Sequence, residues 1–456
     1  MTNQKKSSFT VIGSGRSGAG ISKLLARHGN KVKLYDENTA EKLKYSDADE
    51  LEKEGVELFL GNWSEELLNC DTLVKSPGVP PANEKVQLAV TAGIRVVSEI
   101  EAAFAYCPCP VIAVTGTNGK TTTTVLAGEI LKNAGIDVRV CGNVGVAFSE
   151  VVDGLKTDSI AVVEVSSYQL NDIDSFKADV GVIMNITPDH LEWHGNFENY
   201  LHAKFRIAEN MNDECLLVIN YDDETLRDEA EKIEVPRAYF GTGNDVYRNS
   251  EIGAYADEGI MYFFDKEKEI HEQIMETRDI NIRGRHNLYN SLAAAISARA
   301  FGIGKEVISA TLKEFAGVEH RIEFVREIRG ISFYNDSKAT NTDSMSVALE
   351  SFDGNIVLIM GGREKGNDYS AVDELIKKRV KAIVAVGETK DKIKGHFGNI
   401  VGVETADDMK DAVEKAYRAA VSGDTVLLSP ACKSFDMFDS FEHRGEIFKK
   451  IVSELK

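Results

Sequence analysis

The sequence predicts an α/β protein built from three consecutive units. The first indication is length, because 456 residues exceed the size at which a single hydrophobic core stops growing. The second is an alternation of short apolar runs with helical segments along the chain, which is typical of βαβ units on parallel sheets. The third is a glycine-rich turn after the opening strand of each of the first two units. We place the units at residues 1–98, 99–317 and 318–456.

The first unit has the pattern of a Rossmann-like fold. Its strand-like runs are FTVIG, KVKLYDE, VELFLG, TLVKSPG and IRVVSE. Gly13, Gly15 and Gly18 form G-x-G-x-x-G between the first strand and a helix. Asp36 ends the next strand, where a ribose hydroxyl would be bound. Taken alone, this unit would indicate NAD or FAD binding.

The second unit opens with a phosphate-binding loop in the segment VIAVTGTNGKTTTT, residues 111–124. Gly116 and Gly119 let backbone N–H groups converge on phosphate oxygens at a helix N-terminus. Lys120 adds a positive charge and Thr121 a hydroxyl for Mg²⁺. The strict pattern G-x-x-x-x-G-K-[ST] would need glycine at Val114, so the loop is a variant of the form T-G-T-N-G-K-T. A plain glycine turn is the alternative, and the lysine and threonine favour an ATP- or GTP-binding loop.

Candidate metal ligands follow two further strands of the second unit. Its remaining strand-like runs are SIAVVEVSS, VGVIMNIT and CLLVINY. Glu164 ends the first of these runs, and Asp189 and His190 follow the second. Because the carboxyl ends of parallel strands meet at one edge, these groups could hold Mg²⁺ against the β- and γ-phosphates. Each of them taken singly could equally be an ordinary surface or hydrogen-bonding residue.

The pattern changes again between residues 244 and 317. NDVYRNS, GIMYFFD and EIHEQI predict a small antiparallel insert, and RHNLYNSLAAAISARAFG predicts a helix with Gly302 near its end. The third unit then has strand-like runs ISFYND, GNIVLIMGG, KAIVAVG and DTVLLSP. Polar clusters follow these strands, and Arg321, Lys338, Lys365 and Ser434 would supply donors for anionic groups. Loops of all three units are expected to line one cleft.

Composition restricts the class of partner. The net charge of −20 disfavours binding to nucleic acids or anionic membranes. No apolar stretch approaches the roughly 20 residues of a membrane-spanning helix, and the segment MTNQKKSSFTVIG lacks the features of a secretory signal. The six cysteines form no C-x-x-C pair, so neither a disulfide framework nor a zinc site is indicated. We expect a cytoplasmic enzyme acting on small molecules.

With these motifs the chain resembles the Mur ligases of bacterial cell-wall synthesis. The resemblance covers the whole chain and rests on GSGRSGAG, SPGVP, VTGTNGKTTT, GNVG, EVSSYQL, NITPDHLEWHG, HAKFR, HNLYN, EHRIEF, NDSKATN, GGREKG and LSPACKSFDMFDSFEHRGEIF. It implies a UDP-substrate domain, a P-loop ATP domain and an amino-acid-acceptor domain, which together form an amide bond through an acyl phosphate. The loop of this family also lacks the first glycine, which accounts for Val114.

The resemblance also implies roles for individual residues. UDP-N-acetylmuramoyl-L-alanine would be bound by Gly15, Arg16, Ser17, Asp36, Glu37, Ser76, Asn143 and Ser166. ATP would be bound by Gly116, Thr117, Asn118, Gly119, Lys120, Thr121, Thr122, Asn287, Asn290, His320, Arg321 and Asp336. Two Mg²⁺ ions would be held by Thr121, Glu164, His190 and Lys204, the last as a carbamate. Lys120, Glu164, His190, Lys204 and Lys338 would be catalytic, with Lys338 near the γ-phosphate.

The acceptor amino acid is implied by the third domain. SPACKSFDMFDSF resembles the glutamate-adding members, whereas the D-N-P-R motif of members that add lysine or diaminopimelate does not occur in the chain. D-Glutamate would be received by Thr340, Lys365, Ser434 and the backbone around Phe441. A monomer is expected.

Three alternatives stay open at this stage. Folylpolyglutamate synthase is another ATP-dependent glutamate ligase, but it lacks a UDP-binding first domain, and residues 1–98 form a full dinucleotide-type unit. An NAD-dependent oxidoreductase would explain GSGRSG and Asp36 but would leave the second nucleotide loop unused. A non-catalytic, nucleotide-gated binding protein would leave the ligase motifs without a role.

Overall fold

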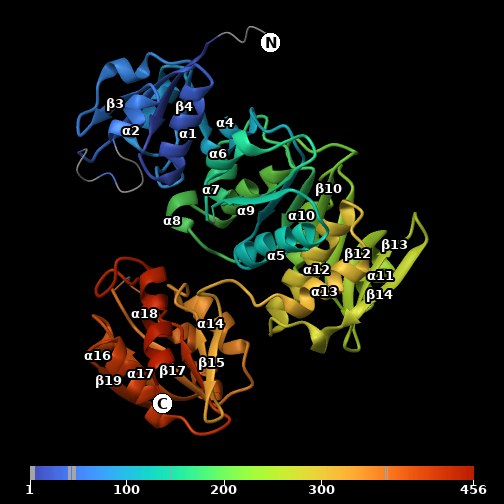
Figure 1. The fold of residues 1–456 in the computed structure, drawn as a ribbon, viewed down its shortest axis with the longest axis vertical. Helices are drawn as coiled ribbons and strands as arrows, with labels where there is room; N and C mark the ends of the chain where they lie inside the picture. Colours follow the sequence, from blue (N-terminus) through green and yellow to red (C-terminus); the bar gives the residue numbers. More distant parts are fainter. Residues whose placement is uncertain are drawn as a thin grey trace. The chain divides into compact units, whose positions relative to one another are not determined.

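The structure is a computed structural model that describes residues 6–39, 43, 48–143, 145–364, 366 and 368–455. It contains three β-sheets, and its helices and strands follow the colour order of Figure 1 from the N-terminus to the C-terminus. The first compact unit comprises Met1–Thr277 and Tyr289–Thr311 and holds the first two sheets. The second compact unit comprises Arg278–Leu288 and Leu312–Lys456 and holds the third. The predicted fold class, three α/β domains with largely parallel sheets, is confirmed.

The first sheet is entirely parallel, with strand order β3-β2-β1-β4-β5. Its strands are β1 (Ser8–Ile12), β2 (Lys31–Asp36), β3 (Val56–Leu60), β4 (Thr72–Lys75) and β5 (Arg95–Ser98). Its helices are α1 (Arg16–Arg27), α2 (Ala48–Lys53), η2 (Glu65–Leu68), α3 (Glu84–Thr91) and α4 (Glu99–Phe104). All five strands match the predicted runs. Chain order reverses between β1 and β4, which is where open α/β sheets bind their ligands.

The second sheet has nine strands in the order β14-β13-β12-β11-β10-β9-β6-β8-β7. They are β6 (Val111–Thr115), β7 (Val138–Gly142), β8 (Ile160–Glu164), β9 (Val180–Ile183), β10 (Leu216–Asn220), β11 (Arg237–Thr242), β12 (Ile252–Asp257), β13 (Ile260–Asp265) and β14 (Ile270–Glu276). The helices are α5 (Lys120–Asn133), α6 (Phe148–Val151), η3 (Val152–Gly154), α7 (Ser167–Leu170), α8 (Leu191–His194), α9 (Phe197–Phe205), η4 (Arg206–Ala208), α10 (Glu224–Ala230), α11 (Asp245–Asn249), η5 (Thr277–Asp279), α12 (Arg285–Ala300) and α13 (Lys305–Glu314). Strand β6 lies between β8 and β9, so the loops after these strands converge.

The predicted antiparallel strands continue this sheet at its edge. The predicted runs GIMYFFD and EIHEQI form β13 and β14, which pair antiparallel with each other. β12 was not predicted as a strand; it pairs antiparallel with β13 and joins β11 in parallel. The prediction of a strand at NDVYRNS was wrong, because Asp245–Asn249 forms α11. Val246 is the fully buried residue of that helix, and one buried residue gives no periodicity that could distinguish helix from strand.

The third sheet has the order β15-β16-β20-β17-β18-β19. Its strands are β15 (Glu323–Ile328), β16 (Ile331–Asn335), β17 (Ile356–Met360), β18 (Val380–Val386), β19 (Gly402–Ala406) and β20 (Thr425–Leu428). Its helices are α14 (Thr342–Glu350), η6 (Ser370–Val372), α15 (Asp373–Arg379), α16 (Lys390–Phe397), α17 (Met409–Ala419) and α18 (Phe441–Glu454). β15 and β16 are antiparallel and the other pairs are parallel.

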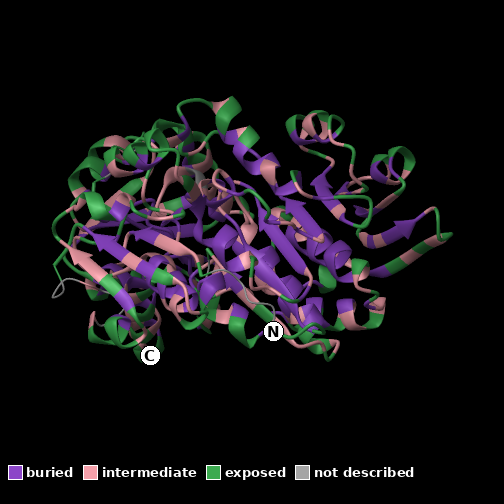
Figure 2. Ribbon diagram, turned by 90° about the horizontal axis from the view of Figure 1, so that it is seen from above, coloured by how far each residue is buried: buried purple, intermediate pink, exposed green. Residues whose placement is uncertain are grey.

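The hydrophobic cores lie along the strands of the three sheets. Figure 2 shows the sheet strands mostly buried, with exposed residues on the outer helices and loops. One cluster joins the first two sheets and contains Val11 and Leu34 from the first together with Val163 from the second. Two clusters cover the third sheet.

Within the part of the chain that the structure describes, no helix has both the length and the hydropathy to cross a membrane.

Candidate active site

The phosphate loop turns sharply out of a buried strand. All five residues of β6 are buried, and Val114 lies inside the strand, so the glycine of the strict motif would fall within the sheet. Gly116 and Gly119 follow with φ of +138° and +84°, a region that side chains disfavour. Gly119 caps α5, which begins at Lys120. The ammonium of Lys120 donates to the carbonyls of Gly116 (2.9 Å) and Thr117 (2.8 Å), which places a cation at the helix N-terminus.

Two residues that the sequence analysis did not single out hold this loop in shape. The amide of Asn185 accepts from Asn118 N (2.8 Å) and donates to Asn118 O (2.9 Å). The hydroxyl of Tyr200 lies 2.9 Å from that of Thr117. Asn185 follows β9 and Tyr200 lies on α9, so the loop is fixed from two neighbouring elements.

Glu164 lies beside the first turn of α5. It ends β8 and is 2% exposed. Its Oε2 accepts from Thr121 Oγ1 at 2.6 Å, and its Oε1 accepts from Asn143 Nδ2 at 2.8 Å. The predicted pair of Thr121 and Glu164 is therefore brought together. Asn143, which the resemblance assigned to the UDP substrate, lies beside this carboxylate through that hydrogen bond.

Lys204, which lies on α9, contacts the same phosphate loop. Its side chain is buried, its Nζ donates to Gly116 O at 2.8 Å and it lies 4.6 Å from the centre of the Tyr200 ring. Burial, reinforced by the nearby charge of Lys120, holds the pKa of Lys204 well below its ordinary value. The lowered pKa favours the neutral amine, which is the nucleophilic form of the side chain.

His190 completes this group. It precedes α8 with φ of +54°, and its Nε2 lies 3.4 Å from Asp189 Oδ2. Burial lowers the pKa of His190, which favours the neutral imidazole that a metal ion requires. A cavity of about 100 Å³ is enclosed by these groups; its lining is Lys120, Asn143, Ser166, Ser167, Tyr168, Asp189, His190, Tyr200 and Lys204.

The first domain holds its predicted residues in a tight turn. Gly18 lies against the backbone of Gly13, so that a Cβ at residue 18 would lie 1.8 Å from Gly13 O. Asp36 accepts from the backbone N–H and the hydroxyl of Ser14 at 2.7 and 2.5 Å, and from the backbone and amide of Asn38 at 2.8 Å each. Burial opposes the charge of Asp36, but these hydrogen bonds prevail and lower its pKa. The carboxylate therefore shapes the turn.

The other predicted UDP contacts lie around this turn. Ser76 Oγ donates to Gly13 O at 3.0 Å, and Gly15 caps α1 ahead of the half-buried Ser17. The guanidinium of Arg16 donates to Gly145 O. Glu37 forms an exposed ion pair with Lys85, and Ser166 caps α7 with Gln169.

The third sheet places its predicted residues at the carboxyl ends of its strands. Asp336 is buried after β16 and accepts from Ser429 Oγ at 2.8 Å, and burial raises the pKa of Asp336 to about 7. His320, with φ of +64°, contacts Asn335 Nδ2 through its Nδ1 at 2.9 Å. Lys338 Nζ lies 4.8 Å from the centre of the Phe441 ring. The half-buried Arg321 and Thr340 and the buried Ser434 lie in neighbouring loops, while Lys365 lies outside the described residues.

Arg444 connects two of these loops and was not predicted as a site residue. It is 2% exposed and donates to Ser337 O at 2.6 Å, to Ser337 Oγ at 2.9 Å and to Cys432 O at 3.0 Å. The loop carrying Lys338 is thereby joined to the loop carrying Ser434.

The helix α12 carries two predicted adenine contacts. Asn290 Oδ1 accepts from Thr123 Oγ1 at 3.2 Å, and a Cβ on Gly119 would lie 2.5 Å from that oxygen. Asn287 Nδ2 donates to Arg283 O at 2.7 Å, within its own helix region. Asn290 thus braces the phosphate-binding helix, and the remaining loop residue, Thr122, is buried.

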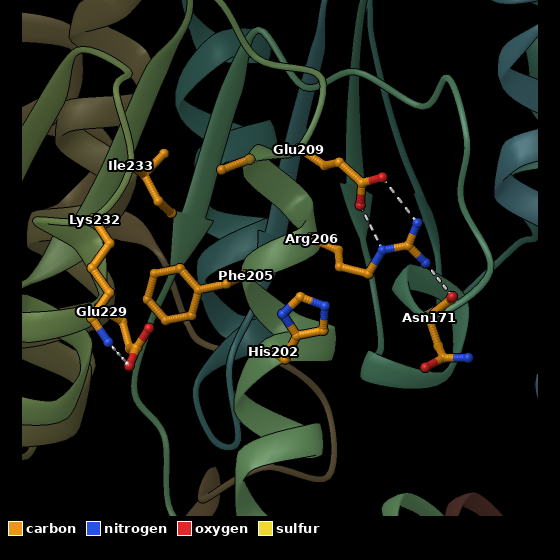
Figure 3. A pocket seen from close by; sticks show the side chains of 9 residues that line it. Asn171, His202, Phe205, Arg206, Glu209, Glu229, Lys232 and Ile233 are labelled. Carbon is orange, nitrogen blue, oxygen red and sulfur yellow. Dashed lines mark hydrogen bonds and ion pairs between the residues drawn. The ribbon is translucent and has the colours of Figure 1, made fainter.

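A larger cavity of about 770 Å³ lies elsewhere in the first unit. It opens beside α9 and η4, where Figure 3 shows His202, Phe205 and Arg206 around it. Its ionic groups pair with one another, Arg206 with Glu209 and Lys232 with Glu229, at 2.5 Å each. Its lining contains none of the predicted site residues.

The fold and this site define a nucleotide-dependent enzyme of the P-loop class, with a separate Rossmann-like domain before the loop. Comparison with protein families finds three matches in chain order. Residues 7–98 match the N-terminal domain of MurD-like Mur ligases, residues 114–298 the Mur ligase middle domain, and residues 320–432 the Mur ligase glutamate ligase domain.

Similar proteins match along their full length. Among those named UDP-N-acetylmuramoylalanine–D-glutamate ligase are the proteins of Caldicellulosiruptor saccharolyticus (43% identical, 98% of each chain covered), Bacteroides fragilis (43%, covering 98% of this chain and 99% of that one) and Salinibacter ruber (41%, 99% and 98%). The chain belongs to the Mur ligase family, whose members are ATP-dependent ligases that form amide bonds. This membership excludes the oxidoreductase interpretation.

Solved structures agree in fold. The UDP-N-acetylmuramate–alanine ligase of Thermotoga maritima superposes with a TM-score of 0.60 at 19% identity, covering 99% of this chain and 100% of that one. A pseudomurein peptide ligase of Methanothermus fervidus gives the same TM-score, identity and coverage.

Proposed function

We propose that this enzyme joins D-glutamate to the alanine carboxylate of UDP-N-acetylmuramoyl-L-alanine, converting ATP to ADP and phosphate, in cytoplasmic synthesis of the peptidoglycan precursor. The observation that carries the proposal is similarity over about the whole chain to relatives that share one name. The MurD-like match of residues 7–98 supports it further. We assign the domains to residues 1–98, 99–317 and 318–456, and we infer a monomer. Folylpolyglutamate synthase is disfavoured because it has no counterpart to the first domain.

The residues around Glu164 suit Mg²⁺. Thr121 Oγ1 and Glu164 Oε2 are hard oxygen donors 2.6 Å apart, and partial desolvation lowers the pKa of His190, which favours its neutral imidazole. We assign two Mg²⁺ ions to Thr121, Glu164, His190 and a carbamate on Lys204. When bound, Mg²⁺ would neutralise charge on the phosphoryl group that is transferred. Because a metal-bound imidazole cannot also accept a proton, we do not assign His190 as the general base.

The chemistry of Lys204 supports its carbamate. Its amine is buried, and the pKa is lowered both by burial and by Lys120. The neutral form of this amine would attack CO₂, so that a C–N bond forms, one N–H proton is released to solvent and the neutral amine becomes an anionic carbamate. A carbamate would also relieve repulsion between two lysines. Lys204→Ala should abolish turnover, and Lys204→Arg should not restore it, because arginine cannot carry the carboxylate. A ¹³C signal from ¹³CO₂ that is present in the wild type and missing from Lys204→Ala would identify the carbamate; its absence from both would exclude it.

The reaction proceeds in two steps. An oxygen of the alanine carboxylate attacks the γ-phosphorus, its O–P bond forms, and the bond to the β-phosphate oxygen breaks to release ADP. Lys120, positioned by the carbonyls of the phosphate loop, and Lys338 stabilise the charge on the transferred group. The D-glutamate amine then attacks the acyl carbon, loses a proton and expels phosphate. We assign the recognition of D-glutamate to Thr340, Lys365, Ser434 and the backbone at Phe441.

An isotope experiment tests the acyl phosphate. UDP-N-acetylmuramoyl-L-alanine labelled with ¹⁸O in the alanine carboxylate is incubated with Mg-ATP and D-glutamate. Direct phosphorylation of the carboxylate transfers one ¹⁸O to each phosphate released, which mass spectrometry detects. Unlabelled phosphate accompanying product formation would overturn the mechanism.

A further inference from the structure

Lys75 is a buried lysine with three partners. Its side chain is 1% exposed at the end of β4. Its Nζ donates to Val79 O at 3.1 Å, lies 2.7 Å from Asp172 Oδ2 and lies 5.1 Å from the centre of the Trp193 ring. A buried ammonium is costly unless it is paired, so removing it would leave Asp172 with an uncompensated charge.

The three partners belong to two different domains. Val79 lies in the turn Ser76–Pro80 of the first domain, and Ser76 in that turn holds the glycine turn through Gly13 O. Asp172 and Trp193 belong to the second domain. Asp172 O also accepts from Ser98 N at 2.8 Å.

An aromatic chain leads from Lys75 to the phosphate site. The Trp193 ring contacts the Tyr168 ring at a centroid distance of 4.4 Å, and the Tyr168 ring contacts the His190 ring at 5.0 Å. Tyr168 and His190 line the cavity that also contains Lys120 and Lys204. A shift of Trp193 would therefore be transmitted to His190 through packed rings.

We propose that Lys75 is a positioning residue for the ligase reaction: it fixes the Ser76–Pro80 turn of the first domain against the Trp193, Tyr168 and His190 wall of the phosphate site. The inference rests on the proposed function, because the UDP-linked substrate must extend from the first domain to the phosphate loop. Losing this contact misplaces the alanine carboxylate relative to the γ-phosphate. The hydrogen bonds that shape the phosphate loop do not involve Lys75, so ATP binding should persist.

The test uses the fluorescence of Trp193. The chain has two tryptophans, so Trp63→Phe leaves Trp193 as the one indole reporter. In this parent, Lys75→Met keeps the length of the side chain and removes its charge. We expect a shifted Trp193 emission, a rise in KM for UDP-N-acetylmuramoyl-L-alanine and a fall in kcat that together lower kcat/KM by roughly tenfold to a hundredfold. Affinity for a fluorescent ADP analogue should stay within about twofold, and Lys75→Arg should restore most of the activity.

Two further variants identify the contact. Asp172→Asn should reproduce the kinetic effect, and Lys75→Met combined with Asp172→Asn should be no worse than Lys75→Met alone, because both changes break one interaction. The control is Lys23→Met, which breaks the Lys23–Glu50 pair (2.8 Å, Lys23 17% exposed) within the first domain. It should leave both emission and kinetics unchanged.

The outcomes separate the two proposals. If the Trp63→Phe parent turns over D-glutamate and Lys75→Met has the same kinetics, the role of Lys75 is overturned and the proposed function stands. A lower melting temperature of Lys75→Met would not change that conclusion. Wild-type protein without D-glutamate turnover overturns the proposed function as well. If Lys75→Met does not fold, Asp172→Asn decides: unchanged kinetics and emission in that variant overturn the role.

Discussion

Glu99 gives a quantitative prediction about stability. It begins α4, is 1% exposed and accepts from Ser149 N at 2.7 Å through Oε1. Among the described residues, its Oε2 has no hydrogen-bond partner. Burial raises the pKa of Glu99 from the ordinary value of 4.5 to about 7. The folded protein therefore retains a proton on Glu99 under conditions where the unfolded chain has released it.

The sign and size of the effect follow from linkage. Between pH 4.5 and about 7 the folded state binds the extra proton, so the contribution of Glu99 to stability falls as pH rises. One pH unit corresponds to about 1.4 kcal/mol, so the penalty is below about 1 kcal/mol at pH 5 and approaches roughly 3 kcal/mol at pH 8. Glu99→Gln keeps an oxygen for Ser149 N and removes the titration.

Calorimetry at several pH values measures this penalty. The melting temperature of Glu99→Gln should exceed that of the wild type by little at pH 5 and by roughly 5 °C at pH 8. Glu52→Gln, an exposed change on α2, is the control and should show no such trend. A difference between Glu99→Gln and the wild type that is the same at every pH would refute the reasoning.

Three other predictions concern binding and turnover. Gly18→Ala should abolish binding of the UDP-linked substrate, because its Cβ would lie 1.8 Å from Gly13 O. ADP binding to the separate phosphate loop should persist. Calorimetric titration with each ligand tests this, and retained UDP-substrate binding would refute the packing argument. Asn185→Ala removes two hydrogen bonds to Asn118 and should raise the KM for ATP roughly tenfold, with an unchanged KM arguing against the brace. EDTA should stop phosphate release and excess Mg²⁺ should restore it; turnover that continues in EDTA would count against the metal assignment.

Local sequence patterns predicted much of the fold. Strands such as β6 and β17 are continuous apolar runs ended by glycine, and they were predicted correctly. β19, Gly402–Ala406, was missed because it is an edge strand with one buried residue, Ala406. Short segments with so few buried positions do not show a reliable period.

The candidate site was predictable where its residues share a motif. Lys120 and Thr121 are adjacent in the loop, and Glu164 ends a buried strand beside it. The supporting contacts were not predictable, because they join distant parts of the chain: 67 residues separate Asn118 from Asn185, and 107 separate Ser337 from Arg444. Only the folded chain shows these pairs.

The central claim is most directly tested by the choice of acceptor. Phosphate release is measured with Mg-ATP and UDP-N-acetylmuramoyl-L-alanine, with D-glutamate, L-glutamate, L-lysine or L-alanine as the acceptor. The account predicts turnover with D-glutamate alone. Turnover with another acceptor and none with D-glutamate would contradict the assignment of the third domain, and no turnover with any acceptor would contradict the proposed reaction itself.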